Sequence, residues 1–375
     1  VGLDCASGML VEHLSPGCQQ MVEIAKALAV GAKVLIMDEP TSSLSSHETG
    51  QLYKVVKELR AQGVGIVYIS HRLGEVKELA DRVTVLRDGR NAGELGRDDV
   101  THDSMVRMMV GRDLSKLYQR PSHVAGETLL EADQVRTPAF PRHASSLCVR
   151  AGEIVGIAGL VGAGRTELLR VLFGIDRAMG GTMRIAGKVV DLRSPHDAIE
   201  AGMALVPEDR KNEALVLDMA VRPNLSLTSL MRDSRNGFLN QQMENEITVT
   251  MIRDLNIKTP GPEQIARFLS GGNQQKIVIG KWLAMKPRVL LLDEPTRGID
   301  VGAKQEIYRL LDELAGRGVA ILFVSSEMEE IIRLADRAIV MHEGRITGEL
   351  ARAAFSEEAI MKLATGVENE MILYS

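Results

Sequence analysis

Two parts of this 375-residue chain carry the same motifs in the same order, always 255 residues apart. The recurring motifs are Leu-Ser (14–15 and 269–270), Asp-Glu-Pro-Thr (38–41 and 293–296), Ala-Asp-Arg (80–82 and 335–337) and Gly-Glu-Leu (93–95 and 348–350). A register without gaps over this length predicts two copies of one fold.

Each copy alternates helices with short apolar strands. In the second copy we expect a helix at 274–285, then a strand that ends in Asp-Glu-Pro, then a β-rich run at 320–325. This alternation predicts an α/β fold, with a mostly parallel sheet covered by helices on both faces.

The repeat also predicts the domain boundaries. The glycine-rich stretch at Gly159 has no counterpart, because the matching position would lie about a hundred residues before Val1. We therefore expect the chain to be N-terminally truncated. Residues 1–110 would be the back part of a first domain that lacks its glycine-rich loop, the polar segment 111–126 a linker, and 127–375 a complete second domain.

Composition and charge give no support to several classes of protein. The net charge of -5 gives no broad electrostatic reason to expect a nucleic-acid partner. The three cysteines are scattered, which fits a reducing cytosol. No segment approaches the roughly 20 apolar residues that a membrane span needs, so a membrane partner would have to be a separate chain.

The segment 159–166 has the pattern of a phosphate-binding loop, because it follows an apolar strand and opens a helix. Glycines allow backbone N–H groups to face phosphate oxygens at a positive helix end. The candidate nucleotide ligands are Gly159, Gly162, Ala163, Gly164, Arg165, Thr166 and Glu167, and Thr166 is also a candidate Mg²⁺ ligand. Arg165 departs from the pattern, which has lysine there. The alternative is a glycine-rich turn that only packs helix on strand.

Two apolar strands end in Asp-Glu, at 34–39 and at 289–294. Asp38 and Asp293 are candidate Mg²⁺ ligands, and Glu39 and Glu294 are placed to orient or deprotonate an attacking water. The alternative for one copy alone is a strand end that caps the next helix. Two copies in register favour the catalytic interpretation.

The segment 269–275, Leu-Ser-Gly-Gly-Asn-Gln-Gln, lies just before the second Asp-Glu strand. We expect Ser270 to cap the next helix, and its hydroxyl and the glycine N–H groups to contact a γ-phosphate held by the opposite domain. The candidate ligands are Ser270, Gly271, Gly272 and Asn273. In the first copy Ser15 and Gly17 are the candidates, but Pro16 removes one N–H group there.

These motifs together resemble ABC ATPases, specifically the double-cassette subunits of ribose/galactose/xylose-type monosaccharide importers. The closest similarity lies in segments 159–167, 206–211, 269–276 and 293–300. The resemblance implies P-loop NTPase cassettes in tandem, each with an antiparallel β part and a helical subdomain. It also places His71 at a γ-phosphate contact, where the second copy has Ser326. Glu208 then stands where glutamine usually senses Mg²⁺ and the membrane partner, although it could be an ordinary charged loop residue.

The resemblance implies two unequal ATP sites, each shared between the loop of one cassette and the signature of the other. The site with Asp38, Glu39 and His71 would hydrolyse ATP, while the site with Asp293 and Glu294 would bind ATP and hydrolyse it poorly. This chain alone is therefore expected to be a weak ATPase.

In the cell, the resemblance implies a peripheral protein at the cytoplasmic face of the inner membrane, working with permease subunits and a periplasmic solute-binding protein. Two alternatives remain. A ribosome-associated tandem ATPase would usually have a long charged linker, whereas the linker here is short. A nucleotide switch without hydrolysis is favoured by Arg165, Pro16 and Ser326 but not by Glu39 and His71.

Overall fold

The computed structural model describes residues 6, 8–41, 44, 46–70, 72–87, 89–110, 123–235 and 238–366. The chain divides into two compact units, Val1–Leu117 with Asp300–Gly302 and Tyr118–Ile299 with Ala303–Ser375. Among the described residues, no helix has both the length and the apolar character that crossing a membrane requires. Most of the expected linker, residues 111–122, lies outside the described part.

The second unit is built on a six-stranded sheet of order β10-β13-β14-β7-β15-β16. Its strands are β7 (Ile154–Gly159), β10 (Met203–Val206), β13 (Val289–Asp293), β14 (Ala320–Val324), β15 (Arg337–His342) and β16 (Arg345–Ala351). Neighbouring strands pair in parallel except β15 and β16. Every residue of β13 and β14 is buried, as expected for parallel strands covered on both faces. The carboxyl ends of β7, β14 and β13 therefore share one edge.

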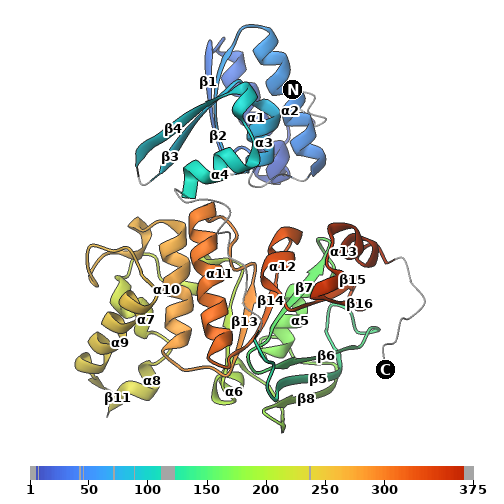
Figure 1. The fold of residues 1–375 in the computed structure, drawn as a ribbon, viewed down its shortest axis with the longest axis vertical. Coiled ribbons are helices and arrows are strands. Elements are labelled where there is room, and N and C mark those ends of the chain that lie inside the picture. The colour runs from blue at the N-terminus through green and yellow to red at the C-terminus, as the bar shows by residue number, and fades with distance from the viewer. Residues whose placement is uncertain are drawn as a thin grey trace. The chain divides into compact units, whose positions relative to one another are not determined.

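Two smaller parts flank this sheet on opposite sides (Figure 1). One is an antiparallel sheet of order β6-β5-β8-β9, with β5 (Thr128–Arg136), β6 (Ser145–Arg150), β8 (Gly180–Ile185) and β9 (Lys188–Val190). The other is helical, with α7 (Val221–Ser226), α8 (Leu230–Asp233), α9 (Gln241–Asp254) and the hairpin β11 (Ser234–Arg235) and β12 (Phe238–Leu239). The expected combination of a mostly parallel sheet, an antiparallel part and a helical subdomain is confirmed.

The remaining helices cover the sheet and connect its strands. They are α5 (Arg165–Leu172), α6 (Pro195–Glu200), α10 (Gly271–Leu283), α11 (Val301–Gly316), α12 (Met328–Leu334), α13 (Glu357–Ala364), the π-helix η4 (Arg210–Ala214) and the short 3-10 turns η5 (Ala266–Phe268) and η6 (Arg352–Ala354). Local sequence starts several of them. At α6, Ser194 and Asp197 form a reciprocal capping box, which satisfies two helix-end donors.

The first unit repeats part of this plan. It contains α1 (Pro16–Ala29), β1 (Val34–Asp38), α2 (Ser46–Ala61), β2 (Gly65–Ile69), α3 (Leu73–Leu79), β3 (Arg82–Arg87), β4 (Arg90–Gly96), α4 (His102–Val110) and the 3-10 turns η1 (Val11–His13) and η2 (Arg97–Asp99). Asp38 pairs with Ile69 across β1 and β2, as Asp293 pairs with Val324 across β13 and β14. The repeat therefore extends to strand register.

One expectation for the first unit is wrong. A sheet covered by helices on both faces should bury the whole apolar run at 34–37. Only Leu35 and Met37 are buried, whereas Val34 and Ile36 are 61% and 68% exposed. In the second unit the equivalent residues of β13 are buried because β10 and β14 flank that strand and helices cover both faces. Among the described residues of the first unit, β1 pairs only with β2, and the face of β1 that carries Val34 and Ile36 is exposed.

Candidate functional site

The strand β7 leads into a glycine-rich loop that ends at the first turn of α5. Gly162 and Gly164 have φ values of 82° and 94°, which residues with a side chain rarely adopt. Gly164 is the N-cap residue of α5, so the first turn is formed by Arg165, Thr166 and Glu167. N–H groups at a helix start have no helical acceptor and attract anions. The structure thus places 159–166 at a strand-to-helix junction suited to phosphate.

The two glycines allow a matched test of this loop. A Cβ atom at Gly164 would lie 2.9 Å from the ring of Phe140 and 3.1 Å from the Cα atom of Gly344, whereas one at Gly162 would meet nothing within 4 Å. We expect Gly162→Ala to cost about 1 kcal/mol of unfolding free energy through backbone strain alone. Gly164→Ala should cost roughly 2–4 kcal/mol because it adds overpacking. Urea unfolding measures both, and equal losses would contradict the packing described here.

Asp293 ends β13 and is 4% exposed. The Thr166 hydroxyl lies beside its carboxylate, while its Oδ1 atom is buried and has no hydrogen-bond partner. Burial raises the pKa of Asp293 to about 6, and the nearby charge of Glu294 acts in the same direction. A buried carboxylate oxygen without a partner calls for an explanation such as an ion. Beside a threonine hydroxyl it suits Mg²⁺, which takes its other ligands from phosphates and water.

Glu294 follows Asp293 in a left-handed backbone conformation, with φ 45°. Its N–H donates to the Val324 carbonyl (3.0 Å), and its Oε2 atom accepts a hydrogen bond from the Ser326 hydroxyl (3.1 Å). Burial raises the pKa of Glu294. Glu39 has the same φ of 45° and donates the equivalent bond to the Ile69 carbonyl (2.9 Å). Both candidate catalytic glutamates therefore share one unusual backbone geometry.

Arg165 turns toward the carboxyl end of β14. It donates a hydrogen bond to the Ser325 carbonyl (2.7 Å), and its guanidinium lies 3.8 Å from Glu294. Burial lowers the pKa of Arg165, whereas the charges of Glu294 and Asp293 raise it. In this conformation the arginine, expected as a nucleotide ligand, balances part of the negative charge of the site.

Glu208 lies after β10 and forms an ion pair with Arg297. Arg210 donates to the carbonyls of Arg297 (2.8 Å) and Gly298 (3.1 Å). A Cβ atom at Gly271 would lie 2.7 Å from the same guanidinium. Arg210 thus joins the segment after β10, the turn after β13 and the start of α10. Sequence reasoning missed it, although it lies only two residues after Glu208.

Ser270 occupies the N-cap position of α10, but its side chain makes no capping hydrogen bond. Its hydroxyl instead accepts from the Asn273 amide (2.9 Å), and Asn273 in turn accepts from the Lys258 N–H (2.8 Å). The expected side-chain cap is therefore wrong, because Asn273 takes the serine oxygen. Gly271 and Gly272 form the first turn of α10.

The first-unit candidates lie at equivalent places. Asp38 ends β1, and Gly17 lies in the first turn of α1. The Ser15 hydroxyl accepts from the Cys18 N–H (3.3 Å), so this serine does cap its helix. His71 lies outside the described residues.

Phe140, between β5 and β6, is a further candidate that the sequence analysis missed. Its ring packs against the backbone of Gly164 and Gly344. An aromatic ring beside a phosphate loop offers a stacking surface for a nucleotide base. No motif marks it, because the contact joins residues from separate elements.

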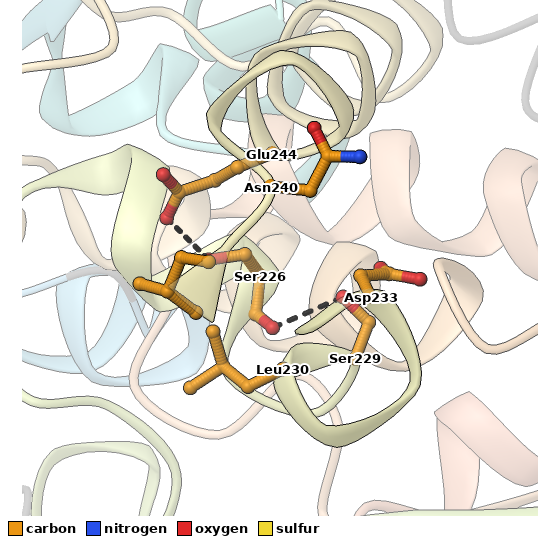
Figure 2. A pocket seen from close by; sticks show the side chains of 7 residues that line it. Ser226, Ser229, Leu230, Asp233, Asn240 and Glu244 are labelled. Carbon is orange, nitrogen blue, oxygen red and sulfur yellow. Dashed lines mark hydrogen bonds between the residues drawn. The ribbon is translucent and has the colours of Figure 1, made fainter. Parts of the chain in front are cut away.

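A small pocket lies in the helical part of the second unit (Figure 2). The Ser226 hydroxyl donates to Glu244 (2.8 Å), and the Ser229 hydroxyl donates to the Ser226 carbonyl (3.1 Å). These bonds join α7 to α9 and close the turn before α8. We interpret the pocket as part of the packing of this subdomain.

A glycine loop between β7 and α5, Asp-Glu at the end of β13 and Ser-Gly-Gly at the start of α10 define the ATP-binding cassette class of P-loop ATPases. The chain belongs to the ABC transporter family, whose sequence model matches residues 3–42 and 143–297.

Curated relatives extend over more of the chain. The ribose import ATP-binding protein RbsA of Bacillus licheniformis is 49% identical over 352 residues, which are 94% of this chain and 71% of that protein. The protein of the same name from Yersinia pestis is 46% identical over 371 residues, 99% of this chain and 73% of the relative.

Solved structures share the fold at lower identity. CbiO1 of Clostridium perfringens, part of the ABC transporter complex CbiONQ, has a TM-score of 0.53 at 21% identity, with 64% of this chain and 93% of that chain covered. A nucleotide-free ATP-binding cassette from an ABC transporter has a TM-score of 0.54 at 20% identity, with coverage of 63% and 98%.

Proposed function

We propose that this chain is the ATP-hydrolysing subunit of an importer for ribose or a similar monosaccharide. The relatives named for ribose import support the substrate class. The observation that carries the ATPase assignment is the Thr166–Asp293 pair, with a buried oxygen that has no partner, beside the Gly164 loop. A ribosome-associated ATPase is not favoured by these relatives.

In this proposal, the backbone N–H groups of 162–166 bind the phosphates, and Arg165 and Glu167 border them. Thr166 and Asp293 hold Mg²⁺, which supplies positive charge to the phosphate oxygens when bound. Glu294, oriented by Ser326, positions the attacking water. Burial raises the pKa of Glu294, which brings a carboxylate base closer to neutral pH. The ring of Phe140 stacks on the base.

We extend the proposal to the repeat. Residues 1–110 belong to one cassette and 127–375 to another, with 111–126 between them. Asp38, Glu39 and His71 serve a second, more active ATP site. The signature residues at 15–17 and 270–273 contact nucleotide held by an opposing cassette, and Glu208 responds to the membrane partner. The family resemblance and the identical geometry of Glu39 and Glu294 support this assignment.

The proposed partners are membrane permease subunits and a periplasmic solute-binding protein, with this chain peripheral at the cytoplasmic face of the inner membrane. Co-purification from membranes with a permease, and restored ribose uptake in cells that lack their own import ATPase, are the expected results. Co-purification with ribosomes instead would contradict the import assignment.

The ATPase assignment is tested by phosphate release with the chain in excess over ATP. We expect slow release that requires Mg²⁺ and falls at least about tenfold in Glu294→Gln, with unchanged ATP affinity. Rapid turnover would contradict the unequal sites, and release that ignores Mg²⁺ would contradict the metal site.

A further inference from the structure

A buried carboxylate on α12 plays no part in the site described above. Glu330 is 2% exposed, and each of its oxygens accepts one hydrogen bond. Oε1 accepts from the Thr296 hydroxyl (2.9 Å) and Oε2 from the Ser325 hydroxyl (2.5 Å). Thr296 lies two residues after Glu294, and Ser325 directly precedes Ser326. The carboxylate therefore joins the two turns that hold the candidate catalytic glutamate.

We call this arrangement, in which a buried glutamate accepts hydrogen bonds from a threonine and a serine on two turns, the glutamate bracket. The same bracket is present in the first unit. Glu75 on α3 is 4% exposed and accepts from the hydroxyls of Thr41 (2.5 Å) and Ser70 (3.0 Å). These three residues correspond to Glu330, Thr296 and Ser325 through the 255-residue repeat. Ser70 directly precedes His71 in the sequence. Two copies that differ in many neighbouring residues thus keep one arrangement around the Asp-Glu turn.

This turn needs support, because the glutamate in it is strained. Glu39 and Glu294 both have φ 45°, and such conformations persist only where the surrounding structure imposes them. One backbone bond to the adjacent strand holds each glutamate. The bracket adds a second connection between the same two turns, through a side chain on the following helix.

We propose that Glu330, and equivalently Glu75, is a positioning residue for ATP hydrolysis that holds the catalytic glutamate and the residue facing it in register. The proposal rests on the proposed ATPase function. Glu330 contacts Thr296 and Ser325, and it acts on Glu294 and Ser326 only through these residues and the backbone. Loss of the bracket should therefore slow hydrolysis more than it weakens ATP binding.

The two brackets differ in the charged and hydrogen-bonding residues next to the glutamate. Glu75 has Arg72 at 3.6 Å and a third donor, the Tyr68 hydroxyl at 2.9 Å. At the equivalent positions the second unit has Glu327 and Phe323.

The surroundings of Glu330 make the second bracket sensitive to pH. Burial raises the pKa of Glu330 to about 7, and the charge of Glu327 adds to this, while the two hydroxyl bonds and Lys304 oppose it. Tyr308 also faces this carboxylate, and burial raises its pKa. The ionised form accepts from both hydroxyls, so hydrolysis at this site should increase between pH 6 and 8 as Glu330 ionises.

The test uses the full chain, ATP binding in Mg²⁺ and single-turnover phosphate release. Glu330→Ala should slow release at least about tenfold while the dissociation constant of ATP changes less than about threefold. Glu330→Gln should stay within about threefold of wild type in both, because its amide can accept from Thr296 and donate to Ser325. The Ser325 hydroxyl can then turn to the Glu327 carbonyl, 3.4 Å away. This variant should also show a smaller rate change around pH 7 than the wild type, and not its complete loss, because Asp293 and Glu294, whose pKa values burial also raises, still titrate.

The matched control is Glu329→Gln on the same helix, where the side chain is 57% exposed and pairs with Arg333, and no change is expected. Should Glu330→Ala not fold, Thr296→Val and Ser325→Ala each remove one bond and should show the same selective loss of rate. A wild-type rate in folded Glu330→Ala, or equal losses of affinity and rate, would overturn this inference alone. A wild-type chain that binds no ATP would overturn the proposed function and the inference with it.

Discussion

Asp293→Asn should make the ligand-free second unit more stable at pH 8 and remove its stabilisation by MgATP. The pKa of Asp293 is raised from 3.8 to about 6 by burial. The contribution of protonated Asp293 to the free energy of unfolding is complete below about pH 4 and is lost as the pH rises through about 6. At pH 8 the folded state therefore contains an unfavourable anion. The cost is about 3 kcal/mol, and asparagine avoids most of it. Loss of a direct Mg²⁺ ligand should also weaken metal binding by at least roughly 10–100-fold, which is the loss seen when a residue that only hydrogen-bonds to a metal ligand is replaced.

Thermal unfolding in EDTA, and then with ATP and Mg²⁺, measures both effects in one protein. The control is Asp176→Asn in the same unit, because the hydrogen bond from Arg170 lowers the pKa of Asp176. Its replacement should lower stability at pH 8 and leave the MgATP effect intact. A destabilised ligand-free Asp293→Asn that still responds to MgATP would contradict both roles of Asp293.

Arg165→Ala should destabilise the second unit by about 3 kcal/mol, because removing one member of a buried ion pair leaves the other charge uncompensated. The variant leaves the Glu294 carboxylate without its nearby cation and the Ser325 carbonyl without its donor. Denaturant unfolding at pH 8 measures the loss. Arg170→Ala on the same helix removes a more exposed pair and should cost about 1 kcal/mol or less.

A double-mutant cycle separates the charge effect from general packing. Glu294→Gln removes the buried anion, so Arg165→Ala should cost less in that background, by about 0.5–3 kcal/mol. Additive losses of unfolding free energy would show that Arg165 stabilises the loop without a favourable interaction with Glu294.

The fold was largely predictable, because it depends on patterns that extend over many residues. The 255-residue repeat, the apolar strands that end in Asp-Glu and the glycine run at 159–164 all specify local backbone and strand order. Burial was less predictable, because equally apolar strands differ in how they are covered. The apolar strand β13 is covered on both faces, while β1, with an equally apolar sequence, has one exposed face.

The details of the site were less predictable, because they depend on side-chain direction and on contacts between distant elements. Arg165 fits the phosphate-loop pattern, but its guanidinium reaches the carbonyl of Ser325, which directly follows β14. Phe140 belongs to no motif, and Arg210 lies in the matching segment 206–211 without an expected role. Asn273 takes the oxygen that Ser270 was expected to use as a cap. Glu330 reads in sequence as one of several acidic helix residues, and only the fold shows that it is buried.

Hydrogen–deuterium exchange of the chain with and without MgATP tests the central claim, that the loop at 159–166 and the end of β13 hold the triphosphate. Leu160 and Val161 in this loop are 42% and 95% exposed. We expect strong protection of amides in 160–167 and 293–297 with MgATP, and little with AMP. Protection elsewhere with none in these two segments would contradict the account.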